Sequence, residues 1–419
     1  MIVLNDTLGA VGGSHTLFLR MCRWYREKGF PVVFLCNNRD NEKIAGQLEK
    51  MGVSIFVIDT GKTKETYEIL KRIDDGDIRV FNFWWNKYLD IEAVKRRYSI
   101  KIENTIYLIH PKCLIKGESY YRASGLLKTI KNGYKSILPK MCVNNAIISM
   151  DEINIEETES YYGIKLDPQP PIIRLPMEVE PVDKEKIIKN GYDNRIIMTS
   201  CRADFPYKGY VVGLIDDFVS LKKQYPDIKL VIVCDGDDVD VLKEKIANVP
   251  TRYKAAINLH GWMSYEELKQ LMNDCMIYIG MGSSVLDSSL RYKPSAVIKF
   301  YTMECIGKDY TADNPYDLAA KEDVDASATM LIKRVLDMDF DEYKAFAEKS
   351  YEEISKIYGI DKVMNQFLRH HNVSQKSILG MKDQLLVSAN NKINSIRFKN
   401  KEEKSSVKHL TKGINERSC

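Results

Sequence analysis

Two cationic side chains, Arg202 and Lys208, stand six residues apart in the segment that follows an expected strand, Arg195–Ser200. An expected helix, Val211–Gln224, begins directly afterwards. A guanidinium fork and a lysine charge next to a helix N-terminus suit the oxygens of a diphosphate. The pattern therefore predicts a diphosphate site in which Arg202 and Lys208 are the catalytic cations. The alternative is an ordinary basic loop exposed to solvent.

A second group of small polar residues follows another expected strand, Met276–Ile279. Gly282, Ser283 and Ser284 offer backbone amides and hydroxyls at the start of a helix, where such groups form an anion-binding nest. Asp287 lies one turn further and can accept hydrogen bonds from a ribose. A favourable interaction with the helix dipole is the alternative role of Asp287.

Two further candidates lie in the first third of the chain. Gly12 and Gly13 follow the short apolar strand Ile2–Asn5 and open a helix. Glycines there let the backbone approach a ligand, and the helix N-terminus favours an anion, although a tight turn is the alternative. His110 ends the expected strand Thr105–Ile109, and this position favours ligand contact over a purely structural role.

The strands and helices that carry these candidate residues indicate how the residues could lie close together. Apolar runs alternate with helical segments through residues 1–180, and again after a proline-rich stretch at 168–181. Such runs indicate parallel strands buried on both faces by helices. We therefore expect an α/β protein with two Rossmann-like, doubly wound domains that face each other across a cleft. In such sheets ligands bind at the carboxyl ends of the strands.

The expected boundaries follow from the same pattern. The first Rossmann-like domain is expected at 1–182 and the second at 183–340. Helices at 341–372 are expected to cross back to the first domain, with a basic tail at 373–419.

Composition restricts the class of protein. With 44% hydrophobic and 29% charged residues, the 419-residue chain has the composition of a globular protein, and no apolar run is long enough for a transmembrane helix. The start lacks the features of a signal peptide, so a cytoplasmic location is expected. Nine cysteines form no CxxC motif, which favours free thiols over a zinc site or a disulfide framework.

The tail at 373–419 holds ten Lys/Arg against four Asp/Glu, although the net charge of the chain is only +4. The spacing within Met381–Phe398 predicts a basic amphipathic helix, which can bind an anionic membrane surface. The alternatives are packing on the body of the protein and a tail without fixed structure. The basic excess is confined to the tail and carries no recognisable nucleic-acid motif, so no nucleic-acid partner is expected.

Residues 1–370 together resemble the GT-B glycosyltransferases, specifically glycosyltransferase family four. Arg202 and Lys208 fall where that family has its diphosphate-binding cations, and 229–236 is similar to its KLVIVGDG strand and turn. Gly261 and Trp262 lie in a segment that resembles the family's base pocket. Gly12-Gly13 resembles the glycine loop that closes over donor phosphate and acceptor, and Ile106–His110 resembles the strand that ends in histidine.

One motif departs from the family. Asp287 resembles the second acid of the E-x7-E motif, which holds the donor ribose, but Ile279 stands where the first acid belongs. Gly280–Ser284 resembles instead a GMG-S/T-S variant of transferases that assemble bacterial surface polysaccharides. In that variant Ser283 and Ser284 would supply the contacts that the glutamate usually makes.

The resemblance implies a retaining transferase that moves a sugar from a nucleotide diphosphate sugar to a glycan or lipid-linked acceptor. The first domain would then hold the acceptor and the second the donor. It implies no metal and no cofactor, because cations and amides stabilise the departing diphosphate. A lipid-linked acceptor would place the protein at the inner face of the cell membrane. The alternative is a non-catalytic GT-B-like subunit that binds glycan or another transferase.

Overall fold

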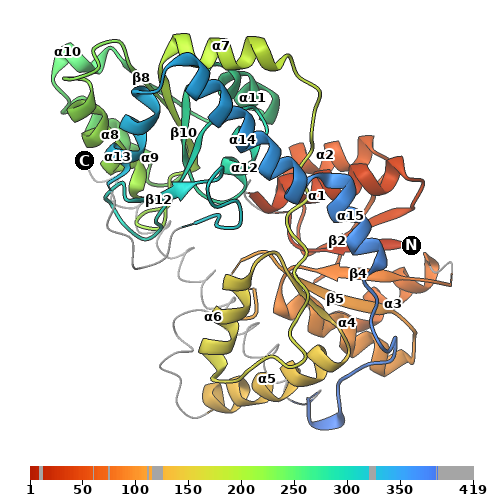
Figure 1. Ribbon diagram of the computed structural model, residues 1–419. Helices are drawn as coiled ribbons and strands as arrows, with labels where there is room; N and C mark the ends of the chain where they lie inside the picture. Colours follow the sequence, from red (N-terminus) through yellow and green to blue (C-terminus); the bar gives the residue numbers. More distant parts are fainter. Residues whose placement is uncertain are drawn as a thin grey trace, which may run out of the picture. The chain divides into compact units, whose positions relative to one another are not determined.

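The computed structural model describes residues 1–8, 13–59, 61–73, 76–110, 113–115, 126–319, 327–383 and 385. The chain divides into two compact units (Figure 1). Unit 1 comprises Met1–Arg174 together with the chain from Gln366 onward, and unit 2 comprises Leu175–Asn365. The second unit thus begins upstream of the boundary expected at 182/183.

Unit 1 is built on a six-stranded sheet in the order β3-β2-β1-β4-β5-β6, in which every neighbouring pair is parallel. Its strands are β1 (Ile2–Asn5), β2 (Val32–Cys36), β3 (Ser54–Val57), β4 (Arg79–Asn82), β5 (Glu103–Leu108) and β6 (Ile147–Ser149). Its helices are α1 (Gly13–Glu27), α2 (Glu42–Lys50), α3 (Thr63–Arg72), α4 (Trp85–Tyr98), α5 (Leu126–Val143) and α6 (Glu152–Tyr162). This parallel sheet with intervening helices confirms the expected Rossmann-like class.

Three asparagines cross the centre of this sheet. The side-chain nitrogen of Asn5 donates to Asn82 at 2.8 Å, and that of Asn82 donates to Asn104 at 2.7 Å. All three residues are at least 96% buried. Because a buried amide without a partner costs free energy, this satisfied chain fixes the register of β1, β4 and β5.

The C-terminal helical segment returns to unit 1. The helical segment expected at 341–372 contains two helices, α14 (Phe340–Tyr358) and α15 (Ile360–Arg369), separated by Gly359. The Arg79 side chain donates to the carbonyls of Phe367 and Leu368 at 2.9 and 3.1 Å. It also pairs with Glu103 at 2.9 Å, so one buried guanidinium ties the end of α15 to the sheet.

Unit 2 holds a second six-stranded sheet, in the order β12-β11-β10-β7-β8-β9. Its strands are β7 (Ile196–Arg202), β8 (Lys229–Asp235), β9 (Ile257–His260), β10 (Ile277–Gly280), β11 (Ser295–Ile298) and β12 (Gly307–Tyr310). All neighbouring pairs are parallel except β11 and β12. The helices are α7 (Lys184–Asn194), α8 (Tyr210–Leu221), α9 (Val239–Ala247), α10 (Thr251–Lys254), α11 (Tyr265–Asp274), α12 (Ser283–Ser289), α13 (Ala328–Leu336) and α14.

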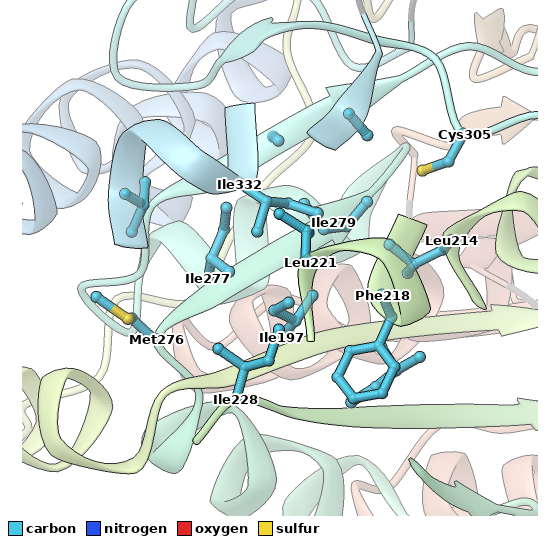
Figure 2. Packing of buried hydrophobic residues seen from close by; sticks show 14 of the residues in the cluster. Ile197, Leu214, Phe218, Leu221, Ile228, Met276, Ile277, Ile279, Cys305 and Ile332 are labelled. Atoms are coloured by element: carbon cyan, nitrogen blue, oxygen red, sulfur yellow. The ribbon is translucent and has the colours of Figure 1, made fainter. Parts of the chain in front are cut away.

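The core of unit 2 lies between its sheet and its helices. Figure 2 shows Leu214, Phe218 and Leu221 of α8 packed with Ile332 of α13 over the strand residues. Ile197, Ile277 and Ile279 are fully buried in the same cluster. Burial of large aliphatic side chains on this scale contributes about 1.5–3 kcal/mol each, so the packing holds the strand ends in fixed positions. Among the described helices none is long and apolar enough to cross a membrane.

Candidate functional site

The centre of the unit 2 sheet is a topological switch point. β7 is followed by β8 on one side, whereas β10, its neighbour on the other side, is followed by β11. Open α/β sheets bind ligands just beyond the carboxyl ends of the strands at such a point. β7 ends at Arg202 and β10 ends at Gly280, so two of the predicted site segments begin at this one position.

A buried tyrosine braces the two strand ends against each other. The Tyr278 hydroxyl accepts a hydrogen bond from the backbone N–H of Ser200 at 3.0 Å and lies 2.5 Å from the Ser200 hydroxyl. Burial raises the pKa of the Tyr278 phenol far above its usual value, so the group stays neutral. A Cβ added at Gly280 would lie 2.7 Å from the Tyr278 ring, which explains why β10 ends on a glycine.

The predicted cations lie at the end of β7 and in the turn that follows it, within a segment that we call the cation loop (residues 202–209). Arg202 is half exposed and pairs with Asp204 at 2.9 Å. The backbone N–H of Lys208 donates to the Asp204 carbonyl at 2.9 Å, which folds the loop into a turn ahead of α8. Lys208 is half-buried. The structure therefore places Arg202 at the last position of β7 and Lys208 two residues before the start of α8.

The loop after β8 supports this turn. The backbone N–H of Ala203 donates to the Asp235 carbonyl at 2.8 Å, and that of Phe205 donates to the Asp238 carboxylate at 2.7 Å. Gly236 has a φ of 137°, and a Cβ there would lie 2.7 Å from the Ala203 carbonyl oxygen. The Asp238 carboxylate thus helps to hold the cation loop in place.

The small-residue segment after β10 is partly engaged within the protein. The N–H of Gly282 donates to the Leu318 carbonyl at 2.6 Å, and the Ser284 hydroxyl donates to the Met281 carbonyl at 3.0 Å. Gly282 has a φ of 69°, a left-handed conformation that glycine adopts without strain. Ser283 is half-buried at the first position of α12. The segment therefore lies at the switch point, with two of its polar groups already hydrogen-bonded.

Asp287 has a partner that the sequence did not reveal. The Tyr265 hydroxyl, at the start of α11, donates to an Asp287 carboxylate oxygen at 2.6 Å. This bond connects α11 to α12. Ile279, which stands in place of the first acid of E-x7-E, is fully buried in the apolar core. A carboxylate at that position would be removed from water and would need a partner.

Gly261 and Trp262 lie at the edge of the sheet. They follow β9, two strands away from β7, and precede α11, which Ser264 and Glu267 cap reciprocally. Trp262 is 49% exposed, an unusual state for so large an apolar ring. The half-exposed ring therefore lies beyond the end of β9, at the carboxyl edge of the unit 2 sheet.

Two of the three residues predicted in unit 1 fall within the described ranges. Gly12 lies outside the described residues, and Gly13 is the first residue of α1. His110 follows β5 at the carboxyl edge and is half-buried, and its carbonyl accepts from the N–H of Cys113 at 3.0 Å. The basic tail beyond residue 385 is likewise outside the described residues, as is position 384.

Sequence reasoning missed a buried carboxyl at the end of β1. Asp6 is 2% exposed, and burial raises its pKa to about 7, although the backbone N–H of Thr7 and the charge of Lys87 act in the opposite direction. The Thr7 N–H donates to it at 2.6 Å. Asp6 follows β1 at the β1/β4 switch point of the unit 1 sheet. A single aspartate after a short strand gives no signal in the sequence.

Eight cysteines fall in the described part of the chain, and all are free thiols, as predicted. No group of three or more His, Cys, Asp or Glu side chains within the described ranges is arranged to hold a metal ion.

Comparisons with known proteins agree with this architecture. Residues 182–284 match the family described as "Glycosyl transferases group 1". This segment begins before α7 and ends with Ser284, so it includes the cation loop and the small-residue segment. No curated protein sequence matches the chain.

Solved structures show the same fold at low sequence identity. HepE from Anabaena, in complex with UDP, is 14% identical with a TM-score of 0.65, covering 88% of this chain and 98% of that one. A glycosyltransferase from Rickettsia africae is 15% identical with a TM-score of 0.62, covering 88% and 97%. TarM from S. aureus, in complex with fondaparinux, α-GlcNAc-glycerol and UDP, is 10% identical with a TM-score of 0.58, covering 88% and 99%. The matched segment and the two-unit architecture together show that the chain has the GT-B fold and that its residues 182–284 are similar to a group 1 glycosyltransferase domain.

Proposed function

We propose that the protein transfers a sugar from a nucleotide diphosphate sugar to a glycan or lipid-linked acceptor, with retention of anomeric configuration. The observation that carries this proposal is the position of Arg202 and Lys208 in the cation loop, which runs from the last residue of β7 to the start of α8 at the switch point of unit 2. The similar HepE structures contain UDP or UDP-glucose, which supports a nucleotide-sugar donor.

The chemical task of the site is to stabilise the departing nucleotide diphosphate. Arg202 offers a planar fork of donors and Lys208 a mobile positive charge, which together complement the developing charge on the leaving oxygens. An incoming diphosphate competes with Asp204 for the Arg202 guanidinium. Because that pair is half exposed, its loss costs about 0–1 kcal/mol, less than a charge-assisted hydrogen bond to phosphate returns. The proposed mechanism uses no metal ion.

The remaining predicted residues take roles around this centre. Trp262 and Gly261 would line the base pocket, and Asp287 would accept hydrogen bonds from the ribose. The Asp287 carboxylate, which accepts a hydrogen bond from Tyr265 at 2.6 Å, is the proposed ribose acceptor. Gly282, Ser283 and Ser284 would contact the donor, while Gly12, Gly13 and His110 of unit 1 would contact donor sugar and acceptor.

A role in bacterial surface polysaccharide or glycoconjugate assembly fits the GMG-S-S variant at Gly280–Ser284. A lipid-linked acceptor would place the enzyme in the cytoplasm, peripheral to the inner face of the membrane. The basic tail, with ten Lys/Arg against four Asp/Glu at 373–419, would supply the attraction to anionic lipid.

A thermal-shift screen against UDP, GDP, ADP, CMP and their common sugar conjugates tests the donor assignment. One nucleotide diphosphate should stabilise the protein more than the others, because a ligand bound only to the folded state raises the free energy of unfolding. The selected sugar nucleotide is then incubated with acceptor glycans, and NMR reads the anomeric configuration of the product. A folded protein that no nucleotide stabilises would contradict the proposal.

A non-catalytic partner subunit is the second candidate. The observation that favours it is Ile279, whose buried apolar side chain replaces the first acid of E-x7-E. Under this alternative the protein would still bind nucleotide. It would neither transfer the sugar of a bound sugar nucleotide nor slowly hydrolyse that sugar nucleotide. Turnover by the purified protein excludes the alternative.

A further inference from the structure

Two thiols lie side by side next to the cation loop. Cys201 of β7 and Cys234 of β8 are directly paired in the parallel register, and their sulfur atoms are 3.5 Å apart. Paired residues on neighbouring strands have Cα atoms about 4.8 Å apart, within the 4.4–6.8 Å span that a disulfide bridges. The two sulfurs therefore need only a small approach to reach the bonding distance of about 2.05 Å.

The surroundings distinguish the two thiols chemically. Cys201 is half-buried, whereas Cys234 is 1% exposed. The hydrogen bond with the Cys234 thiol lowers the pKa of the Cys201 thiol, and the positive charge of Lys208 acts in the same direction against the effect of burial. The hydrogen bond with Cys201 and burial raise the pKa of Cys234. Since the thiolate is the reactive form, Cys201 is the partner that reacts first.

The other described cysteines lack this arrangement. Burial alone raises the thiol pKa of Cys22, and it is the largest cause of the raised pKa of Cys275 and Cys142. A thiol kept protonated and away from solvent reacts slowly with oxidants.

We propose that Cys201 and Cys234 form a reversible disulfide with a peroxide as oxidant. The Cys201 thiolate attacks hydrogen peroxide, an S–O bond forms as the O–O bond breaks, and the departing hydroxide takes up a proton to become water. The Cys234 sulfur then attacks the Cys201 sulfenic acid, the S–O bond breaks, and a second water leaves. Two thiols and one peroxide thus give one disulfide and two waters, and a small dithiol reverses the change.

The disulfide would act directly on the proposed donor site. Arg202 and Asp235 form the next register pair after the two cysteines, and the N–H of Ala203 donates to the Asp235 carbonyl at 2.8 Å. The disulfide would fix the spacing of the two side chains that immediately precede this register pair, from which the cation loop begins. Oxidation is therefore expected to weaken nucleotide binding, and this consequence, unlike the disulfide itself, rests on the proposed function.

Peptide mapping after oxidation tests the disulfide. The protein is treated with hydrogen peroxide, remaining thiols are alkylated, and the sample is digested with trypsin without reductant. Cleavage after Arg195 and Arg202 releases the peptide 196–202, and cleavage after Lys229 and Lys243 releases 230–243. The expected product is these two peptides joined, lighter by two hydrogens than their sum, and separated again by dithiothreitol.

Three samples control the assignment. The Cys234→Ser variant should lose the joined peptide, whereas Cys142→Ser, which removes a buried thiol of unit 1, should retain it. Protein that is unfolded in urea before oxidation should form disulfides without preference for the Cys201–Cys234 pair. Alkylation of both Cys201 and Cys234 after peroxide treatment, or joining of either to a different cysteine in the folded protein, would overturn the inference.

Nucleotide titration of the reduced and the oxidised protein separates the two claims. A reduced protein that binds no nucleotide contradicts the proposed function and leaves the disulfide to be judged by mass alone. Equal affinity of both forms, with the joined peptide present, overturns the regulatory consequence.

Discussion

The hydroxyl of Tyr278 in β10 accepts a hydrogen bond from the backbone N–H of Ser200 in β7 at 3.0 Å. The two strands meet at the switch point of the unit 2 sheet, and Ser200 lies two residues before Arg202. One buried phenol therefore fixes the position from which the cation loop begins.

Replacing this phenol tests its role. Tyr278→Phe leaves the Ser200 N–H without its acceptor, so the free energy of unfolding should fall by about 1–2 kcal/mol. Chemical denaturation measures the change, and Tyr316→Phe, at a side chain that is 52% exposed, is the matched control. A variant as stable as the wild type would show that the phenol does not brace the strands.

The carboxylate of Glu180 holds two nearly buried cations of unit 2. It accepts from Lys269 at 2.5 Å and also pairs with Arg291. Burial alone would raise the pKa of Glu180, but the bond from Lys269 and the charge of Arg291 bring it below its usual value. Glu180→Gln should cost about 1–2 kcal/mol, less than a fully buried pair because Glu180 is 37% exposed.

The stability lost in Glu180→Gln should decrease as the pH falls. A depressed carboxyl pKa contributes stability that is present above the unfolded value and is lost as pH falls through the folded one. The gap between wild type and Glu180→Gln should therefore shrink below about pH 4.5. Glu185→Gln, at an exposed pair with Lys344, should change stability by less than about 0.5 kcal/mol. An equal loss in both variants would contradict the assignment.

Lys293 is fully buried in unit 2, and its ammonium donates to the carbonyls of Ile187 and Asn273, each at 2.9 Å. Burial lowers its pKa from 10.5 to about 8. Between these values the unfolded chain binds a proton that the folded protein has lost, so this group makes stability rise with pH. The size of the effect is about 3 kcal/mol.

Lys293→Met removes the pH-dependent contribution of Lys293 to the free energy of unfolding. Buried tyrosines and cysteines lower stability at alkaline pH in both proteins, so the measured quantity is the difference between the two unfolding free energies. Relative to the variant, the wild type should gain stability between pH 8 and 10.5 and show a constant difference below pH 8. A difference that stays constant across the whole range would contradict the shifted pKa.

The contribution of Asp6 to the stability of unit 1 should change with pH in the opposite direction to that of Lys293. Its pKa is raised from 3.8 to about 7 by burial, so the folded protein keeps a proton that the unfolded chain has released. Its contribution to stability should be full below pH 3.8 and should decline by about 4 kcal/mol as pH rises to 7. Asp6→Asn should lack this decline in urea titrations at several pH values. Parallel pH profiles of wild type and variant would refute the shift.

The sequence predicted those elements whose signal is local. The apolar runs placed β7, β10 and α8 within a few residues of their observed bounds, because continuous burial of a strand or one face of a helix is visible in a single segment. No element was predicted between Ile109 and Ile147, where α5 continues through Pro139. The antiparallel strand β12 was also missed, because Gly307–Tyr310 is too short and mixed for a strand pattern.

The contacts of the site depend on distant segments and could not be predicted. Arg202 and Lys208 stood out because two cations between a strand and a helix are recognisable from spacing alone. The Tyr265–Asp287 bond and the pairing of Cys201 with Cys234 depend on which elements become neighbours and in which register. No single segment of the sequence shows either contact, because only the folded protein brings these side chains together.

The proposed sugar transfer depends most directly on the diphosphate site of Arg202 and Lys208. Isothermal titration calorimetry of the nucleotide diphosphate that gives the largest thermal shift should yield a Kd that rises at least about tenfold in Arg202→Ala/Lys208→Ala. The matched control is Lys189→Ala/Lys243→Ala, which removes two exposed cations of α7 and α9 and should bind as the wild type does. An unchanged Kd in the folded Arg202→Ala/Lys208→Ala protein would contradict the site.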